Sequence, residues 1–412
     1  MSGFFVVGEK KERPGVYKRY ENAGGVEAAG ARTGVGCALV TGNWGALNTP
    51  VTIDQSTDIS SVIGAGSGHD AITAFMAGGM EECVVVRVGT GGTPATITLK
   101  DTTASTAVDA VVLTALYPGN RAFTITVKAS LDDETAKEAT IYEGTKALEK
   151  VTFAAGKTEV DGIVAAFANS KYVKAPKKAP GNGTLADITQ KAFTTGTNPT
   201  ATAAAYGEAA NASEAEVRDM IIVDTNDAAV HTLIATHVAR VFQEGAYTMA
   251  TVAEPSSVAI ETRMQHAAAF NDEKIHYVLN PYIGTDGVEY EGYMLAARIG
   301  GLICAGAANA SLTHTVISGA AGLKETLNSG TIKKALKSGC LVLSTSKSKQ
   351  VWIEKAINTL VTLSKDQDAG WKKIRRVKER FELMDRVEQT TEVLIGQVDN
   401  DTDGRAAVIA AA

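Results

Sequence analysis

The sequence predicts an α/β protein whose mostly parallel sheet is covered on both faces and carries an inserted antiparallel β unit. Short apolar runs such as 83–88 and 220–223 alternate with segments of helical periodicity, a pattern typical of buried parallel strands joined by helices. Between about 92 and 200 the pattern changes to alternating Thr and Val, which is typical of half-buried antiparallel strands. The chain has 412 residues, enough for two or three domains.

Residues 1–25 are predicted to form an N-terminal arm. Pro14 and Gly15 interrupt regular structure, and a short extended segment follows at 16–20. Because this segment has no hairpin mate nearby, we expect it to pair at a distance, in this chain or in a neighbouring one. The residues expected to form this contact are Pro14, Gly15, Val16, Tyr17 and Tyr20.

The α/β core is predicted in two pieces, 26–91 and 201–348. The first piece has the pattern of a strand (36–41), a loop (43–45), a helix (70–76) and a strand (83–88). The second piece continues the alternation with strands at 220–223, 247–253 and 275–279, a helix at 226–244, and a helix capped by Ser256 or Ser257 that ends at 270.

The insertion and its connection back to the core are predicted at 92–200. Strands at 95–99 and 123–127 flank a turn at 118–120. A loose tract rich in Lys, Pro, Gly, Asn and Thr follows from 174 to 200, and we expect it to be a surface connection.

The last segment, 349–412, is predicted to contain both helix and strand. Strands near 340–344 and 350–353 lead into it, and it contains a charged helix and a Val-Ile strand at 393–398.

Composition and charge exclude several classes of protein. Lys and Arg number 40 against 46 Asp and Glu, and this net charge of -6 disfavours nucleic-acid binding. The first residues lack the features of a secretory signal, and the most apolar stretch, 293–310, contains Arg298, so we expect a buried helix rather than a membrane span. Four scattered cysteines without a C-x-x-C pair favour free thiols in a reducing compartment; they are Cys37, Cys83, Cys304 and Cys340.

Two patterns suggest an enzyme at first sight. The glycine-rich segment 64–68 precedes a helix, but its spacing fits neither dinucleotide nor phosphate-loop fingerprints, so a flexible surface turn is preferred. Asp224 follows a strand, as the aspartate of a subtilisin-like triad does, but suitable His and Ser partners do not follow it. We therefore expect Asp224 to cap the next helix, with no catalytic residue and no cofactor.

Metal binding finds little support. No two histidines have the i, i+4 spacing of a helical metal site. The acidic run 399–404 resembles the first half of a calcium loop, but Ala410 stands where a bidentate Glu is required. An acidic turn leading into a helix is the preferred interpretation, and calcium at Asp399–Asp403 is left open. The histidines are His69, His231, His237, His266, His276 and His314.

The sharpest charge feature is a run of cations at 371–381 in an otherwise acidic chain. On a helix, an apolar stripe would face the core and leave the cations toward solvent, where they could dock an acidic partner or simply be solvated. The stripe is Ile374, Val377, Phe381 and Met384, and the cations expected to face solvent are Lys372, Lys373, Arg375, Arg376 and Arg380.

Five short motifs, in this order and spacing, make the chain resemble the contractile tail sheath proteins of bacteriophages, prophages and phage-tail-like bacteriocins. The resemblance covers nearly the whole chain. The motifs are RPGVY at 13–17, YPGNR at 117–121, GCLVL at 339–343, INTL at 357–360 and DGR at 403–405.

The resemblance implies a subtilisin-like core without its triad, a β-sandwich-like insertion, and a C-terminal α+β domain at 349–412 that faces the tail tube. The residues expected on this tube face are Lys372, Lys373, Arg375, Arg376 and Arg380. The resemblance also implies a helical homo-oligomer of stacked rings, with the tube, baseplate and tail terminator proteins as partners and no nucleic acid or membrane insertion. Terminal arms would add strands to sheets of neighbouring subunits. Such a protein belongs to the virion tail and is assembled in the cytoplasm of the bacterial host.

The resemblance has one departure and leaves alternatives open. Family members usually continue past the DGR turn with a helix and a final strand, so we expect this chain to be truncated at its C-terminus and largely monomeric in solution. A degenerate serine hydrolase or other α/β enzyme is the alternative class, and a sheath-like component of a cellular injection apparatus is a third interpretation.

Overall fold

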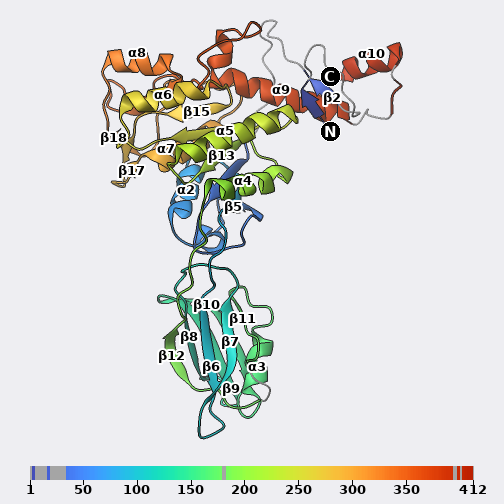
Figure 1. Ribbon diagram of the computed structural model, residues 1–412, viewed down its shortest axis with the longest axis vertical. Coiled ribbons are helices and arrows are strands. Elements are labelled where there is room, and N and C mark those ends of the chain that lie inside the picture. The colour runs from blue at the N-terminus through green and yellow to red at the C-terminus, as the bar shows by residue number, and fades with distance from the viewer. Residues whose placement is uncertain are drawn as a thin grey trace.

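The computed structural model describes residues 2–4, 16–18, 34–178, 182–392, 397–399 and 401–411. Figure 1 shows an α/β core, a β unit that extends from one end of it, and the C-terminal helices at one side near the N-terminal strands. In the same view the β unit stands apart from the α/β core.

A seven-stranded sheet forms the centre of the core, with the strand order β19-β15-β14-β13-β3-β5-β4. Six strands are parallel and β4 is antiparallel at one edge, as the continuous apolar runs predict for the parallel members. The strands are β3 (Gly36–Val40), β4 (Pro50–Asp54), β5 (Glu82–Arg87), β13 (Met220–Val223), β14 (Met249–Ala253), β15 (Ile275–Val278) and β19 (Cys340–Leu341).

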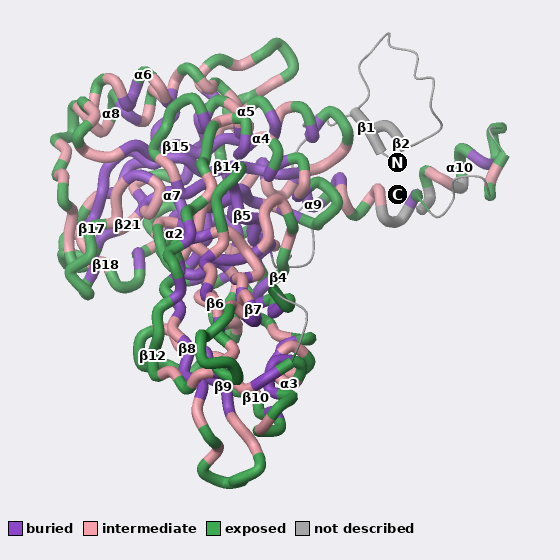
Figure 2. Tube along the Cα trace, turned by 60° about the horizontal axis from the view of Figure 1, so that its bottom comes forward, coloured by how far each residue is buried: buried purple, intermediate pink, exposed green. Residues whose placement is uncertain are grey.

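Helices cover both faces of this sheet, each through its own hydrophobic cluster. One face packs against α2 (Ser67–Met76), α7 (Gly292–Ala305) and α9 (Ile374–Glu392). The other packs against α4 (Ala203–Ala212), α5 (Ala228–Gln243), α6 (Ile260–Phe270) and α8 (Ser329–Lys337). Figure 2 shows buried segments running through the core between these helices.

Helix α7 is the buried, small-residue helix expected from the apolar stretch 293–310. A Cβ on Gly301 would lie 2.1 Å from the carbonyl oxygen of Phe75 in α2, so glycine permits this close helix pair. In the described part of the chain, no helix is both long and apolar enough to cross a membrane.

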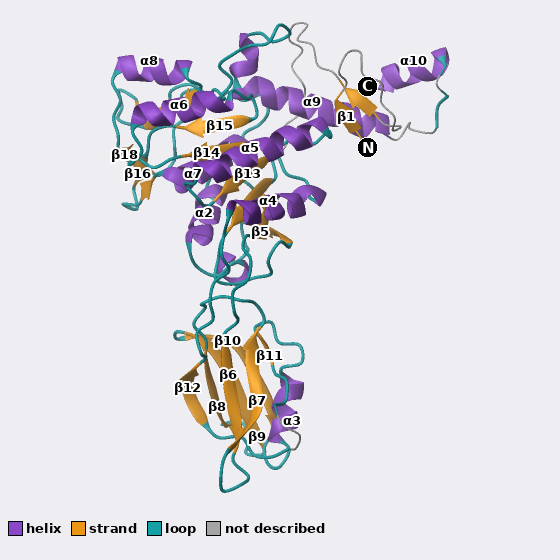
Figure 3. Ribbon diagram, viewed as in Figure 1, coloured by secondary structure: helices purple, strands orange, loops and turns teal. Residues whose placement is uncertain are grey.

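The inserted unit consists of two antiparallel sheets that enclose a separate hydrophobic cluster, with α3 (Glu159–Ala166) beside them (Figure 3). Its two connections to the core run together, because Thr90, Thr93 and Thr96 bridge to Thr200, Thr197 and Thr194. The strands are β6 (Thr96–Asp101), β7 (Val108–Ala115), β8 (Thr124–Ala129), β9 (Ala136–Glu143), β10 (Lys146–Ala154), β11 (Val173–Lys174) and β12 (Ile188–Ala192).

The remaining described elements are short or peripheral. Helix α10 (Thr402–Ala411) packs against α9, and β1 (Ser2–Phe4) pairs in parallel with β2 (Val16–Lys18). The others are α1 (Ile59–Val62), η1 (Ser213–Ala215), η2 (Ala369–Lys372), β16 (Tyr282–Gly284), β17 (Glu289–Tyr290), β18 (Ala320–Leu323), β20 (Leu343–Thr345) and β21 (Val351–Ile353).

Three local predictions are wrong. Neither Ser256 nor Ser257 caps α6, because Ala259 occupies the cap position and Ser256 instead donates to Glu291 Oε2 at 2.6 Å. No strand or helix is predicted between 46 and 66, yet β4 and α1 lie there; β4 has only one buried side chain, Ile53, which is enough for an edge strand. Of the strand predicted at 393–398, residues 397 and 398 form a turn and a bend, and 393–396 lie outside the described residues.

Candidate functional surfaces

The position where an open parallel sheet usually binds a ligand is filled by the protein itself. The chain leaves β3 toward β5 on one side and continues from β13 toward β14 on the other, so the switch in strand order lies between β3 and β13. Asp224 follows β13 at this point and is 5% exposed. Its Oδ2 accepts hydrogen bonds from Thr41 N (2.9 Å), Thr41 Oγ1 (2.5 Å) and Ser67 Oγ (2.7 Å), and its Oδ1 accepts one from Tyr206 at 2.6 Å.

These bonds give Asp224 a structural role that differs from the predicted one. The cap of α5 is Asp227, which accepts from Ala229 N at 2.8 Å, so the prediction that Asp224 is the cap is wrong. Burial and the neighbouring carboxylate of Asp224 raise the pKa of Tyr206 well above its usual value. Asp224 thus ties β3, α2 and α4 to β13.

The glycine-rich segment 64–68 serves the same packing. Gly64 and Gly68 are buried, so the prediction of a flexible surface turn is wrong for them. A Cβ on Gly68 would lie 1.9 Å from the carbonyl oxygen of Thr41. The glycine therefore allows α2 to approach the end of β3 and present Ser67 to Asp224.

A second group of titratable side chains lies between α5 and α6. Glu254 is 5% exposed, and its Oε2 accepts hydrogen bonds from His266 Nδ1 (2.8 Å) and Tyr277 (2.5 Å). The described residues that line the adjoining cavity include His231 but no Ser or Cys that could act as a nucleophile. The cavity holds about 390 Å³.

The cysteines and the acidic turn also have structural environments. All four cysteines are free and buried, as predicted, and burial raises the pKa of Cys37 to about 11, so this thiol is inert at neutral pH. In the acidic turn, Asp401 Oδ1 accepts from Gly404 N at 2.7 Å beside the start of α10. Among the described residues, no three His, Cys, Asp or Glu side chains are arranged to hold a metal ion.

Helix α9 presents the apolar stripe that its sequence predicts. Ile374, Val377, Phe381 and Met384 are all buried, at 6% exposure or less. Phe381 packs between Phe242 and Tyr247, with ring centroids 5.5 and 5.6 Å apart.

The cations of this helix divide into different environments. Lys373 is exposed, and Arg375 and Arg376 are partly exposed beside Glu379, each with an N–O distance of 3.8 Å. Lys372 is partly buried, and its Nζ donates to Val361 O at 2.6 Å.

Arg380 does not lie on the solvent-exposed face of α9 where the sequence pattern predicts it. It is 5% exposed, and its guanidinium carbon lies 3.4 Å from the ring centroid of Trp371. The expectation that this cation faces solvent is wrong, because stacking on an aromatic ring holds a guanidinium against the protein.

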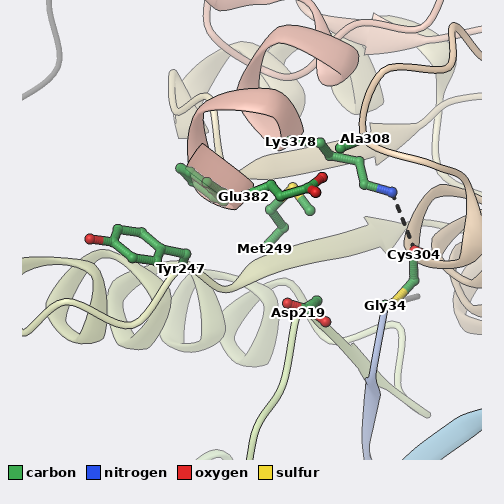
Figure 4. Close-up of a pocket in the computed structure, with 9 residues that line it drawn as sticks. Gly34, Asp219, Tyr247, Met249, Cys304, Ala308, Lys378 and Glu382 are labelled. Atoms are coloured by element: carbon green, nitrogen blue, oxygen red, sulfur yellow. Dashed lines mark hydrogen bonds between the residues drawn. The ribbon is translucent and has the colours of Figure 1, made fainter. Parts of the chain in front are cut away.

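The local pattern also missed the role of Lys378. Its Nζ donates to the carbonyl oxygens of Ile303 (2.6 Å), Cys304 (3.2 Å) and Gly306 at the end of α7. Figure 4 shows the bond to Cys304. A cation at this position complements the negative end of the helix dipole. The cavity beside it has about 30 Å³ of space, which suits one or two water molecules and no larger ligand.

The predicted arm is described only in part. Val16 and Tyr17 belong to β2, which pairs with β1 in the same chain and lies against α9. Pro14, Gly15 and Tyr20 lie outside the described residues.

The junction between core and insertion contains buried residues that the sequence analysis did not identify. Trp44, in the loop after β3, is 3% exposed and enters the hydrophobic cluster of the insertion. Its ring centroid lies 5.0 Å from that of Tyr117, 5.3 Å from Phe123 and 5.9 Å from Tyr172.

Arg87 completes the junction with polar contacts. It is 2% exposed, and its guanidinium donates to Gly42 O (2.7 and 3.2 Å), Gly45 O (2.6 Å) and Pro118 O (2.7 Å). Burial lowers the pKa of Arg87 to about 10, so the side chain stays charged at neutral pH. Since Pro118 belongs to the insertion, one buried cation fastens both parts.

Comparison with known families gives two adjoining matches. Residues 199–359 match the family described as the phage tail sheath protein central domain. Residues 90–198 match the phage tail sheath protein beta-sandwich domain. No curated protein sequence matches the chain.

Solved structures share the fold. A sheath tail protein from Desulfitobacterium hafniense has a TM-score of 0.74 and 20% identity, with 96% of this chain and 86% of that chain covered. A sheath tail protein from Listeria innocua has a TM-score of 0.69 and 23% identity, covering 93% and 83%.

Proposed function

Because the chain belongs to the phage tail sheath protein family, as a structural sheath subunit, we propose that it polymerises around a tail tube and contracts to drive the tube through a bacterial envelope. The observation that carries this proposal is the pair of family matches that adjoin at 198 and 199 and fall on the β unit and the core. Contraction would draw on subunit contacts that are less favourable in the extended lattice than in the contracted one.

Electron microscopy of the protein produced together with its tube protein tests this function. Regular helical sheaths around tubes, in a long and a short state, are the expected result. Tubes that remain bare in the presence of folded, soluble chain would contradict it.

The proposed partners follow from this function. They are further copies of the chain in stacked rings, the tail tube, and the baseplate and terminator proteins that close the two ends. The N-terminal arm, including Val16 and Tyr17, would supply a strand to a neighbouring subunit. In support, β1 and β2 form a small two-stranded sheet, and its outer edges have hydrogen-bonding groups to offer.

We also propose that the start of α9 faces the tube. Lys373, Arg375 and Arg376 are the accessible cations there, with Lys372 beside them, whereas Arg380 contributes by holding Trp371. Their charge would attract an acidic tube surface.

Charge reversal tests this face. Arg375→Glu with Arg376→Glu should abolish assembly on the tube while leaving thermal unfolding nearly unchanged, because both side chains are partly exposed. Lys347→Glu with Lys349→Glu, in the exposed β20–β21 turn, is the matched control. Unchanged sheath assembly by the Arg375 and Arg376 variant would exclude this face.

The alternative class, an α/β enzyme of serine hydrolase type, has a direct test. The subtilisin-like topology remains part of our proposal, supported by the central parallel sheet, but the carboxylate at its switch point is bonded to Thr41, Ser67 and Tyr206. Labelling of a single Ser by a fluorophosphonate probe would favour the enzyme, and we expect none.

A further inference from the structure

The β4–β5 edge of the central sheet carries an acidic corner, formed by Asp54, Glu81 and Glu82. All three side chains are exposed. Asp54 stands directly opposite Glu82 in the ladder, and like charges at opposed positions are unfavourable. Among the residues that the structure describes, no cation forms an ion pair with any of the three.

The other end of the sheet carries a lysine face on α8, formed by Lys333, Lys334 and Lys337. All three are exposed, while Ala335 is buried against the core. Lys337 follows the other two by four and three residues, so the charges are neighbours on one side of the helix and repel each other. Within the described ranges these lysines also have no ion-pair partner.

Other exposed charges in the core are paired within the chain, although among the described residues single charges such as Glu261 and Lys355 are not. Arg240 is exposed and pairs with both Glu214 and Glu244, and Lys324 pairs with Glu289 and Glu291. What distinguishes the acidic corner and the lysine face is that, within the described residues, each gathers three charges of one sign with no opposite charge paired to them; Asp54 Oδ1 accepts hydrogen bonds there only from uncharged groups, Ser56 N, Ser56 Oγ and Thr57 Oγ1.

One chain cannot bring the two surfaces together. Glu82 begins β5, and α8 ends just before β19, so both surfaces lie at the amino-terminal side of the parallel strands. Five strand spacings separate β5 from β19, which at about 4.8 Å each is about 24 Å. Only a second molecule can neutralise either surface at contact distance.

We propose that the lysine face of one copy docks on the acidic corner of the next copy. The occupant is a second copy because this chain itself supplies the complement of each surface, in charge and in number of charges. The two surfaces are different, so the contact is head to tail and leaves one of each free at the ends of a row. Such a contact continues into a ring or a helix, and in this respect the inference rests on the proposed sheath function.

Charge reversal with complementation is the experiment. Lys333→Glu, Lys334→Glu and Lys337→Glu are combined in one variant, and Glu81→Lys with Glu82→Lys in another. Because the chain is expected to be largely monomeric under ordinary conditions, association is measured by sedimentation velocity at low salt and high protein concentration, where a weak contact is populated. Each variant alone should self-associate at least about tenfold more weakly than the parent chain under these conditions. A mixture of the two variants should recover association, because the unchanged lysine face of one variant meets the unchanged acidic corner of the other, and the two reversed surfaces also have opposite charges.

Thermal unfolding, a control variant and cross-linking distinguish loss of the contact from loss of folding. All the substituted side chains are exposed, so thermal unfolding should change little. The Lys347→Glu and Lys349→Glu variant should associate like the parent. Zero-length carboxyl–amine cross-linking of mixed isotope-labelled chains should join Lys333, Lys334 or Lys337 of one copy to Glu81 or Glu82 of another.

Failure of the docking contact and failure of the sheath function would give different results. Normal sheaths formed by both reversed variants would overturn the docking contact and leave the function standing. If the parent chain neither self-associates nor coats tubes, both fail. Loss of tube binding alone in the α8 variant would assign the lysine face to the tube and overturn the contact between copies.

Discussion

Two regions of the molecule use the same device, a cation that donates to backbone carbonyls, in different settings. At the core–insertion junction, Arg87 is 2% exposed and bridges carbonyls from two parts of the chain. At the α9 contact, Lys378 is half-buried and holds the end of one helix, α7. The cation of the junction is therefore buried between the two parts that it joins, whereas the cation of the α9 contact lies at the partly exposed edge of that contact.

This difference between the junction and the α9 contact predicts which of the two, the insertion or α9, separates more easily from the core. The insertion shares Trp44 with the core loop, so separating them would expose an aromatic cluster and several carbonyls. Helix α9 contributes an apolar stripe to the cluster on one face of the sheet and a lysine to the end of α7. We expect the insertion to follow the core as a unit and α9 to separate at lower cost.

Trp44→Ala should give the largest effect. Replacing a buried Trp by Ala lowers the free energy of unfolding by about 4 kcal/mol. Here the lost contacts are those that join the core loop to the insertion. Urea unfolding should show separate transitions for the core and insertion in place of a common one. Trp352→Ala, at a half-buried Trp stacked on His314, is the control and should cost less. Equal losses for both would refute a special role for Trp44.

Arg87→Met should follow, at about 3 kcal/mol, because the carbonyls of Gly42, Gly45 and Pro118 would lose a charged donor. Denaturant unfolding measures this loss, and limited proteolysis near residue 90 should accelerate. Arg240→Met removes an exposed arginine and should cost less than about 1 kcal/mol. A junction variant as stable as this control would show that the cation does not fasten the two parts.

Acid should weaken the α9 side through His276. Burial, and next the positive charge of Lys378, lower the pKa of this imidazole to about 3. The unfolded chain binds the proton below about pH 6.5 and the folded chain does not, so stability is full above pH 6.5 and declines as pH falls toward 3. The loss at pH 5 is about 2 kcal/mol, and His276→Asn should flatten the pH profile. A profile as steep as the parent's would assign the loss to other groups.

Lys378→Met should have the smallest effect, about 1 kcal/mol, since water can reach part of the vacated carbonyls. Hydrogen exchange should increase in α9 and at the end of α7 and remain unchanged at the junction. Lys373→Met, at an exposed lysine just before α9 begins, is the control. Faster exchange at the junction would contradict the separation of the two regions.

Local periodicity predicted a large part of the fold. The apolar runs at 83–88 and 220–223 correspond to β5 and β13, and the stripe from Ile374 to Met384 is buried. These predictions succeeded because strand and helix repeats bring side chains to one face whatever the distant contacts. β4 was missed because only Ile53 marks its buried side.

The candidate surfaces were less predictable from the sequence. Arg380 has the same charge and helix as Arg376, yet it stacks on Trp371 in the preceding turn. Trp371 belongs to the short 3-10 helix η2 before α9, so residue spacing within α9 could not show where its ring lies.

The sequence by itself determined the alternation of strands and helices, the position of the insertion and the family resemblance, because each depends on short-range order along the chain. Only the tertiary structure decided that Asp224 bonds to Thr41 and that Arg87 reaches Pro118. These partners are 183 and 31 residues apart. A buried charge takes whichever donors or acceptors the folded chain brings to it, and no local spacing encodes that choice.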